Sequence, residues 1–383
     1  MVGEQITTLV LYEISVMLIF AVLGYMLSKK TGQPVSVGII FIGVLLGPSV
    51  FGLLSYNETI AIIARIGSII LLFLAGLSVD YSSIYNKKAL LVGIVGGLLP
   101  FAGGAVITAA FGFDLITSIF VGATLTATCL GITSALLREM GKMNTETAKL
   151  MLGAAVVDDV VGLLVLSVVS AAPSFAFMPL ITKISLAIIF LVTISFFGIK
   201  LVPRIVDVFD KNFGIVSGHL TFTFGMGIVF GFSYIAEAIG LAAILGAFLA
   251  GVCLSNTLYS RFFHHGGEYL EAVFTSMFFI AIGIVVELTA IVTSFWLIVA
   301  LSAVAIATKL FGCGFAARKC GMNRKDSLIV GVGMAPRGEV AFIIALFGLS
   351  IGVISREIYS SIVFVSFITT VITLVALKRL YGK

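Results

Sequence analysis

Five charged side chains stand inside long apolar runs of the sequence: the acids Asp158, Asp159 and Glu339, and the bases Lys309 and Arg337. A charge at the centre of a lipid bilayer costs roughly 2.5–3.5 kcal/mol on insertion scales, so each of these residues needs a partner or a function. Lys309 can neutralise one aspartate, and Arg337 can neutralise Glu339. One carboxylate is then left without a fixed partner, and it predicts a site for a mobile cation, either a proton or a metal ion.

The two aspartates are adjacent, and this spacing limits what they can do. Neighbouring residues of an α-helix point about 100° apart, so Asp158 and Asp159 cannot both face the same partner. One can face Lys309 while the other faces a cavity where protons and cations compete. An intramembrane aspartyl protease, by contrast, needs two carboxylates that share a proton. Neighbours that diverge on one helix do not suit that chemistry, so we expect no enzyme activity.

The composition places these charges in a membrane protein. Of the 383 residues, 60% are hydrophobic and 11% are charged, whereas a soluble domain has about a quarter charged residues. The net charge of +5 does not indicate nucleic-acid binding, because the basic residues form no stripe. The four cysteines show no paired spacing, so neither a disulfide nor a bound cofactor is expected.

A helix that crosses a bilayer needs about 20 apolar residues. Thirteen runs of the sequence meet this condition, which predicts an all-α integral membrane protein. The runs lie at about 8–28, 34–54, 57–79, 88–112, 115–137, 144–172, 178–203, 217–238, 240–256, 266–286, 290–317, 325–350 and 354–377. The first, Thr8–Ser28, lacks a cleavage site and is expected to be a retained span rather than a signal peptide.

The loops between these runs orient the chain. Eighteen of the 23 basic residues fall in alternate loops, and the opposite loops contain only Arg356. Basic residues collect on the cytoplasmic side of membrane proteins. We therefore expect the N-terminus outside the cell membrane and the C-terminus in the cytoplasm.

Two of the runs carry residues that interrupt a helix. Pro336 removes a backbone donor from the run 325–350, and the run 115–137 contains a hydroxyl-rich segment with a glycine. Interrupted spans in different halves of a chain mark the ion site of a transporter, and hydroxyls and freed carbonyls are hard ligands for small cations. The residues concerned are Thr126, Thr128, Cys129, Gly131 and Thr133 in the first segment, and Pro336 and Gly338 in the second.

Four segments resemble one family. Leu71–Gly76, Thr126–Thr133, Gly153–Val160 and Gly333–Val340 are together similar to the monovalent cation:proton antiporters, in particular the sodium/proton exchanger branch with a paired-aspartate motif. The resemblance covers essentially the whole chain. It implies an inverted-repeat fold of thirteen spans with two discontinuous helices that cross.

The resemblance also implies a division of the chain and a homodimer in the lipid bilayer. A mobile core would comprise about 88–172 and 290–377. A dimerisation part would comprise about 1–79 and 217–286. A linking helix would lie at about 178–203.

Carried over residue by residue, Asp159 is similar to the carboxylate that binds the transported sodium ion. Asp158 resembles the acid that pairs with Lys309, and Thr128 matches a hydroxyl near the ion. By that resemblance we expect alternating access, in which sodium or lithium binds the deprotonated site and protonation releases it. If Lys309 also loses its proton, two protons exchange per sodium ion and transport is electrogenic; otherwise the exchange is one for one.

Other features leave alternatives open. The resemblance pairs Arg337 with Glu339 beside the second crossover. Relatives often have an acid where this chain has Arg65, and many have serine at Cys129. Potassium/proton exchange is the main alternative, and an ion channel is a more distant one.

Two histidines complete the candidates. We expect His264 and His265 to lie in a solvated cytoplasmic loop rather than to sense pH.

Overall fold

The structure is a computed structural model of the chain. It describes residues 2–78, 86–129, 133, 137, 140–142, 145–169, 185–186, 189–190, 193–213 and 218–381. The regular elements within these ranges are all helices, as the hydropathy of the sequence predicts.

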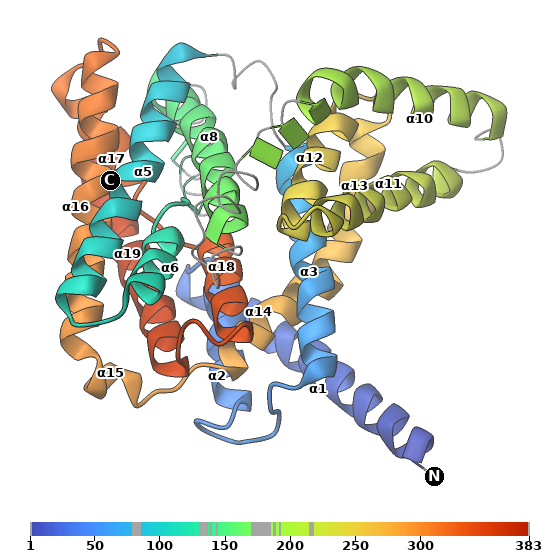
Figure 1. Ribbon diagram of the computed structural model, residues 1–383, viewed down its shortest axis with the longest axis horizontal. Helices are drawn as coiled ribbons and strands as arrows, with labels where there is room; N and C mark the ends of the chain where they lie inside the picture. The colour runs from blue at the N-terminus through green and yellow to red at the C-terminus, as the bar shows by residue number, and fades with distance from the viewer. Residues whose placement is uncertain are drawn as a thin grey trace. The chain divides into compact units, whose positions relative to one another are not determined.

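The chain divides into two compact units, each assembled from two distant stretches (Figure 1). Unit 1 comprises Met1–Val79 and Ile181–Glu287, and unit 2 comprises Asp80–Leu180 and Leu288–Lys383. These ranges lie close to the expected dimerisation part and mobile core, whose roles stay predictions. The first residues of the expected linking helix, 178–184, lie outside the described residues.

Unit 1 contains helices that approach one another through glycines. A Cβ added at Gly76 of α3 would lie 2.1 Å from the backbone oxygen of Phe248 in α12, so only glycine allows this contact. Small residues let membrane helices pack at short range in this way. The helices of unit 1 are α1 (Val2–Thr31), α2 (Val35–Leu46), α3 (Glu58–Leu77), η1 (Ile194–Gly198), α10 (Ile199–Phe213), α11 (Gly218–Ala238), α12 (Ala243–Ser255), α13 (Ser260–Leu270), η3 (Glu271–Thr275) and α14 (Ser276–Ile284).

Outside the apolar spans of unit 1, Asp210 of α10 joins three elements. Its carboxylate accepts hydrogen bonds from Thr221 of α11 and from the Tyr259 hydroxyl, the latter at 2.5 Å. The hydrogen bonds from Thr221 and Tyr259 lower the pKa of Asp210 below its ordinary value. The carboxylate therefore stays ionised throughout the neutral range and holds α10 against its neighbours.

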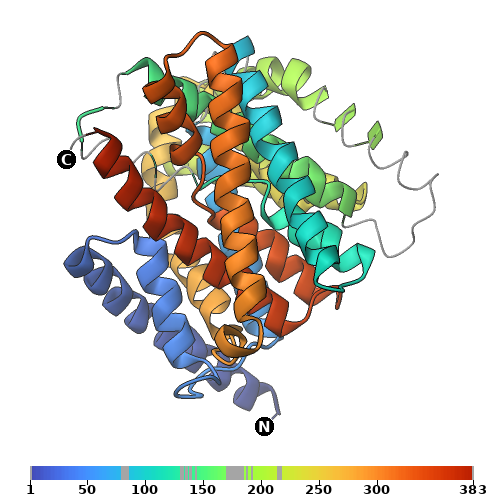
Figure 2. The ribbon, with the colours of Figure 1, turned by 90° about the vertical axis from the view of Figure 1, so that its left-hand side faces the viewer.

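Unit 2 is arranged around helix α16, which packs against α5 and α19 (Figure 2). Helix α5 in turn packs against α6 and α8. The helices of unit 2 are α5 (Lys87–Ala110), α6 (Leu115–Thr124), α8 (Glu146–Val169), α15 (Ala290–Thr293), α16 (Phe295–Lys319), α17 (Arg324–Gly333), α18 (Glu339–Ser350) and α19 (Arg356–Tyr381).

Local sequence signals explain where several of these helices begin. The Asp114 carboxylate accepts from the backbone N–H groups of Ile116 and Thr117 and so caps α6. Asn57 and Asn323 cap α3 and α17 in the same manner. Such side chains satisfy donors that the first turn of a helix leaves free.

Seven helices in the described ranges are long and apolar enough to cross a membrane. Four apolar helices are shorter, namely α2, α6, α12 and α18. The expected run 34–54 is helical only over Val35–Leu46, and the expected run 325–350 is divided into α17 and α18. The chain is thus a many-helix membrane protein with interrupted spans.

Candidate ion-binding site

Both predicted helix breaks lie in unit 2. Helix α17 ends at Gly333 and α18 begins at Glu339, so the predicted interruption at Pro336 is confirmed. Helix α6 ends at Thr124, and the residues from there to Cys129 are not helical. Gly131, which we expected in the break after α6, lies outside the described residues.

The two breaks contact each other directly. The backbone N–H of Cys129 donates to the Pro336 carbonyl over 2.9 Å, and the Thr133 hydroxyl donates to the Gly333 carbonyl over 2.7 Å. A Cβ added at Gly338 would lie 2.6 Å from both Cβ and Sγ of Cys129, so glycine is required where the segments cross. Unwound backbone at membrane depth must find hydrogen-bond partners within the protein, because its groups are no longer paired along a helix. The crossing supplies such partners.

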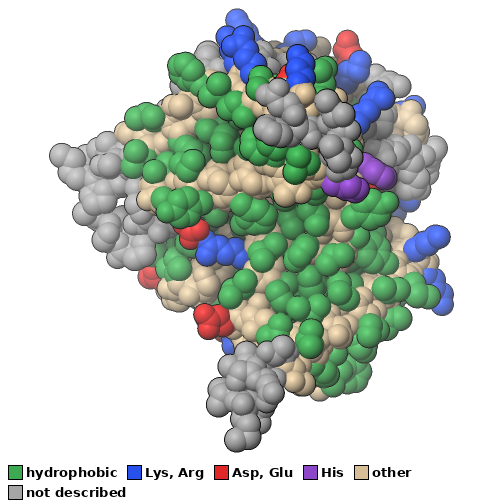
Figure 3. All heavy atoms as spheres, turned by 90° about the vertical axis from the view of Figure 1, so that its right-hand side faces the viewer, with side chains coloured by type: hydrophobic (Ala, Val, Ile, Leu, Met, Phe, Trp, Pro, Cys, Tyr) green, Lys and Arg blue, Asp and Glu red, His purple; other side chains and the backbone are tan. Residues whose placement is uncertain are grey.

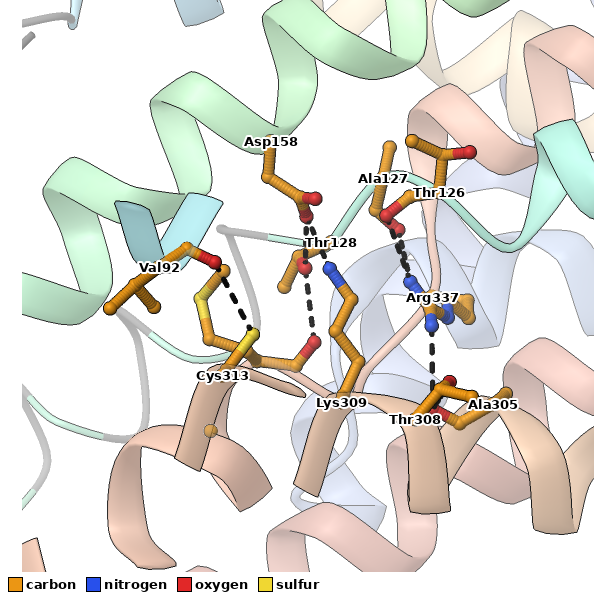
Figure 4. A network of polar contacts seen from close by, with 12 residues as sticks. Val92, Thr126, Ala127, Thr128, Asp158, Ala305, Thr308, Lys309, Cys313 and Arg337 are labelled. Carbon is orange, nitrogen blue, oxygen red and sulfur yellow. Dashed lines mark hydrogen bonds and ion pairs between the residues drawn. The ribbon is translucent and has the colours of Figure 1, made fainter. Parts of the chain in front are cut away.

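Asp158 of α8 lies beside this crossing as a completely buried carboxylate. Its Oδ2 accepts from Lys309 Nζ of α16 and from the Thr128 hydroxyl, each over 2.6 Å (Figure 4). The Thr128 oxygen also lies 3.0 Å from the Met334 carbonyl. A hydroxyl carries one proton, so Thr128 can donate fully to only one of these acceptors at a time.

Asp159, one residue further along α8, has a different environment. Its side chain is 6% exposed, and its buried Oδ1 has no hydrogen-bond partner within the described part of the chain. Lys309 pairs with Asp158, and no ion pair of Asp159 is found among the described residues. The structure therefore separates the two acids as helix geometry requires: one is neutralised by a lysine, and the other has no ion-pair partner among the described residues.

Arg337 corrects the sequence prediction. The expected ion pair with Glu339 is wrong, because the buried guanidinium donates instead to the carbonyls of Thr126 and Ala127 over 3.2 and 2.9 Å (Figure 4). A third contact reaches the Ala305 carbonyl over 3.4 Å. Glu339 is the first residue of α18, where the helix dipole favours a carboxylate. Arg337 thus stabilises the α6 break rather than an acid.

Sequence reasoning missed three residues next to the ion pair. A Cβ added at Gly97 of α5 would lie 3.1 Å from the unpartnered Oδ1 of Asp158, and one at Gly96 would lie 2.5 Å from the Sγ of Cys313. The available signal was the glycine pair within an apolar run, which marks a face that another helix approaches closely.

The remaining candidates lie in unit 1. Arg65 of α3 forms an ion pair with Glu237 of α11. The expectation that the histidines occupy a loop is wrong, because both lie in α13. The Nε2 of His264 lies 3.2 Å from the Leu77 carbonyl at the end of α3, while His265 is exposed.

Two interrupted membrane helices that cross beside a buried carboxylate are the arrangement typical of a secondary transporter. The chain belongs to the family described as "Sodium/hydrogen exchanger, transmembrane", which matches residues 17–381.

Named relatives are similar to this chain over almost its full length. The Na(+)/H(+)-K(+) antiporter GerN of Bacillus cereus is 36% identical, with 97% of this chain and 96% of the relative covered. A Na(+)/H(+) antiporter of Enterococcus hirae is 32% identical, with 96% of each chain covered.

A solved structure is also similar. The sodium proton antiporter MjNhaP1 from Methanocaldococcus jannaschii at pH 8 superposes with a TM-score of 0.75, over 98% of this chain and 100% of that one. The sequence identity is 15%, so this likeness concerns the fold.

Proposed function

We propose that the chain exchanges sodium or lithium ions for protons across the cell membrane, with Asp159 as the carboxylate that binds either ion. The observation that carries this proposal is the buried Oδ1 of Asp159, which has no hydrogen-bond partner among the described residues and lies one residue from an acid that Lys309 already neutralises. A buried carboxylate without a fixed counter-charge is costly, so it favours a mobile cation at that position.

The oxygens at the crossing suit a small, hard cation. The Thr128 hydroxyl and the carbonyls freed by the crossing lie in the same unit as Asp159. In this proposal sodium binds the deprotonated carboxylate, protonation releases it, and alternating access exposes the site to one side of the membrane at a time. Unit 2, which contains all of these residues, is expected to act as the moving part.

The number of protons per sodium ion depends on the Lys309–Asp158 pair. If sodium binding releases Lys309 from Asp158 and the lysine loses its proton, two protons exchange per sodium ion. The cycle then moves one net charge, worth about 2.3 kcal/mol per 100 mV. We propose this electrogenic cycle, which an imposed potassium-diffusion potential would accelerate or slow in proteoliposomes.

The test of the site is Asp159→Asn in proteoliposomes that contain a pH dye. Sodium- and lithium-driven proton movement should fall to the background level, because an amide can neither lose a proton nor supply an anionic ligand. Asp326→Asn, which changes an acid in the first turn of α17, is the control and should retain exchange. Persisting exchange in Asp159→Asn would contradict the site assignment.

Potassium/proton exchange is the second candidate, because the relative GerN is described as a Na(+)/H(+)-K(+) antiporter. Replacing sodium by potassium in the same assay decides between them. From the family resemblance we also propose a homodimer in the lipid bilayer. From the charges of the loops we propose that the N-terminus lies outside and the C-terminus in the cytoplasm.

A further inference from the structure

Behind the buried ion pair of unit 2, helix α5 presents Gly96 to three polar groups of its neighbours. A Cβ added at Gly96 would lie 2.5 Å from Sγ of Cys313, 3.6 Å from Nζ of Lys309 and 3.9 Å from Oδ1 of Asp158. The last two distances are ordinary van der Waals contacts, whereas the first is too short for any side chain. The sulfur of Cys313 therefore fills the hollow that Gly96 leaves, next to the ammonium group of Lys309.

The thiol of Cys313 also contacts the backbone of α5. Its Sγ donates to the Val92 carbonyl over 3.8 Å, and both groups are buried. A carbonyl oxygen has two lone pairs, so it can accept this weak bond beside the one within the helix. Figure 4 shows the thiol between the Val92 carbonyl and the Lys309 side chain. The thiol thus separates a backbone acceptor from the ammonium group.

Lys309 has the donors and the reach to take such an acceptor. An ammonium group carries three donors on a flexible four-carbon stem. Oδ2 of Asp158, at 2.6 Å, is the acceptor found for Lys309 in the described part of the chain, and Oδ1 of the same carboxylate has no hydrogen-bond partner there. One contact does not fix a flexible side chain, so the packing around the ammonium group must do so.

We propose that Cys313 is a positioning residue for exchange: its sulfur keeps the Lys309 ammonium group on Asp158 and away from the backbone of α5. This inference rests on the proposed exchange at Asp159. In the proposed cycle, sodium binding releases Lys309 from Asp158. A steric stop that favours the ion pair therefore weakens sodium binding and speeds sodium release.

Cys313→Ala removes this stop and frees the Val92 carbonyl. The ammonium group can then retreat, so its charge opposes the bound cation less. The apparent KM for sodium should fall about fivefold, the order expected when a unit charge retreats by about 3 Å at an effective dielectric constant of about 20. The maximal rate should fall as well, because bound sodium leaves more slowly.

A second variant returns the lost bulk from the opposite helix. In Gly96→Ala/Cys313→Ala the new methyl group occupies the place of the sulfur, at ordinary contact distance from Lys309 and Asp158. It should restore the KM and the maximal rate of the wild type. Cys253→Ala is the control, because Cys253 is a fully buried thiol of unit 1 that also contacts a backbone carbonyl. This control should keep both wild-type values.

Sodium-driven proton movement in proteoliposomes, measured over a range of sodium concentrations, gives both parameters. A thiol that only fills space in the core would give a lower maximal rate at an unchanged KM. That result, or wild-type values of both parameters in Cys313→Ala, would overturn the proposal. A double variant that keeps the low KM of Cys313→Ala would overturn it too, because the stop would then not be steric.

Thermal unfolding in detergent tests the same contact without transport. Lys309→Gln should cost less stability in a Cys313→Ala chain than in the wild type, because the ion pair is already weakened there. Equal losses in both chains would show that the thiol does not act through Lys309. A wild-type chain that exchanges no cation overturns the proposed function instead, and the unfolding measurement then decides the role of Cys313 alone.

Discussion

Lys309 and Asp158 are both fully buried, so each depends on the other for its charge. Removing one partner of a buried pair leaves an uncompensated charge and typically costs about 3–5 kcal/mol. We predict that Lys309→Gln destabilises the folded protein on this scale, because it leaves the Asp158 carboxylate buried without its counter-charge.

Thermal unfolding in detergent measures this effect. The double variant Lys309→Gln/Asp158→Asn is the control, since it removes both charges and should recover most of the lost stability. A double variant less stable than Lys309→Gln alone would show that the ion pair is not the source of the destabilisation.

The sequence was informative about single residues where a charge has few possible partners. Adjacent acids on one helix must diverge, and the structure places them so, with Asp158 on Lys309. The sequence was misleading for Arg337, because counting acids against bases ignores backbone carbonyls. The break after α6 supplies such carbonyls at Thr126 and Ala127, and their position depends on the fold.

At the scale of elements, α5 forms the wall behind the ion pair, and Gly97 is the point of closest approach. A Cβ there would lie 3.1 Å from Asp158 Oδ1 and 2.9 Å from Val161 Cγ1. We predict that Gly97→Ala displaces the Asp158 carboxylate, lowers sodium/proton exchange several-fold and shifts the pH of half-maximal exchange. Alanine favours a helix over glycine by about 1 kcal/mol, which should limit any loss of stability.

Exchange rates measured across pH in proteoliposomes, together with thermal unfolding, test this prediction. Gly227→Ala in α11 is the matched control, because a Cβ at that helical position would contact nothing within 4 Å. Its pH profile should equal that of the wild type. A Gly97→Ala protein with a normal profile would show that α5 leaves room for the carboxylate to move.

The elements themselves were predictable to different degrees. Apolar length identified the spans, and proline and glycine identified the division between α17 and α18. The helix that the run 266–286 predicts begins earlier, at Ser260 of α13, because the polar residues of α13 shorten the apolar run that signals a span. Its placement comes from packing, which brings His264 to the Leu77 carbonyl.

At the scale of the whole molecule, the distribution of basic residues makes a prediction about orientation. Most Lys and Arg side chains on the face in Figure 3 gather at its top, with a few at its right side and one among the hydrophobic side chains of its middle. Basic loops stay on the cytoplasmic side during insertion. An odd number of spans then requires the two termini on opposite sides of the membrane, with the C-terminus in the cytoplasm.

Epitope tags placed before Met1 and after Lys383 test both statements at once. In inside-out vesicles, an added protease should remove the C-terminal tag and spare the N-terminal one, and in right-side-out vesicles the result should reverse. Detergent, which exposes both tags, controls for intrinsic protease resistance. Removal of both tags in one vesicle type would mean an even number of spans, and it would invalidate the alternation of loops from which the orientation follows.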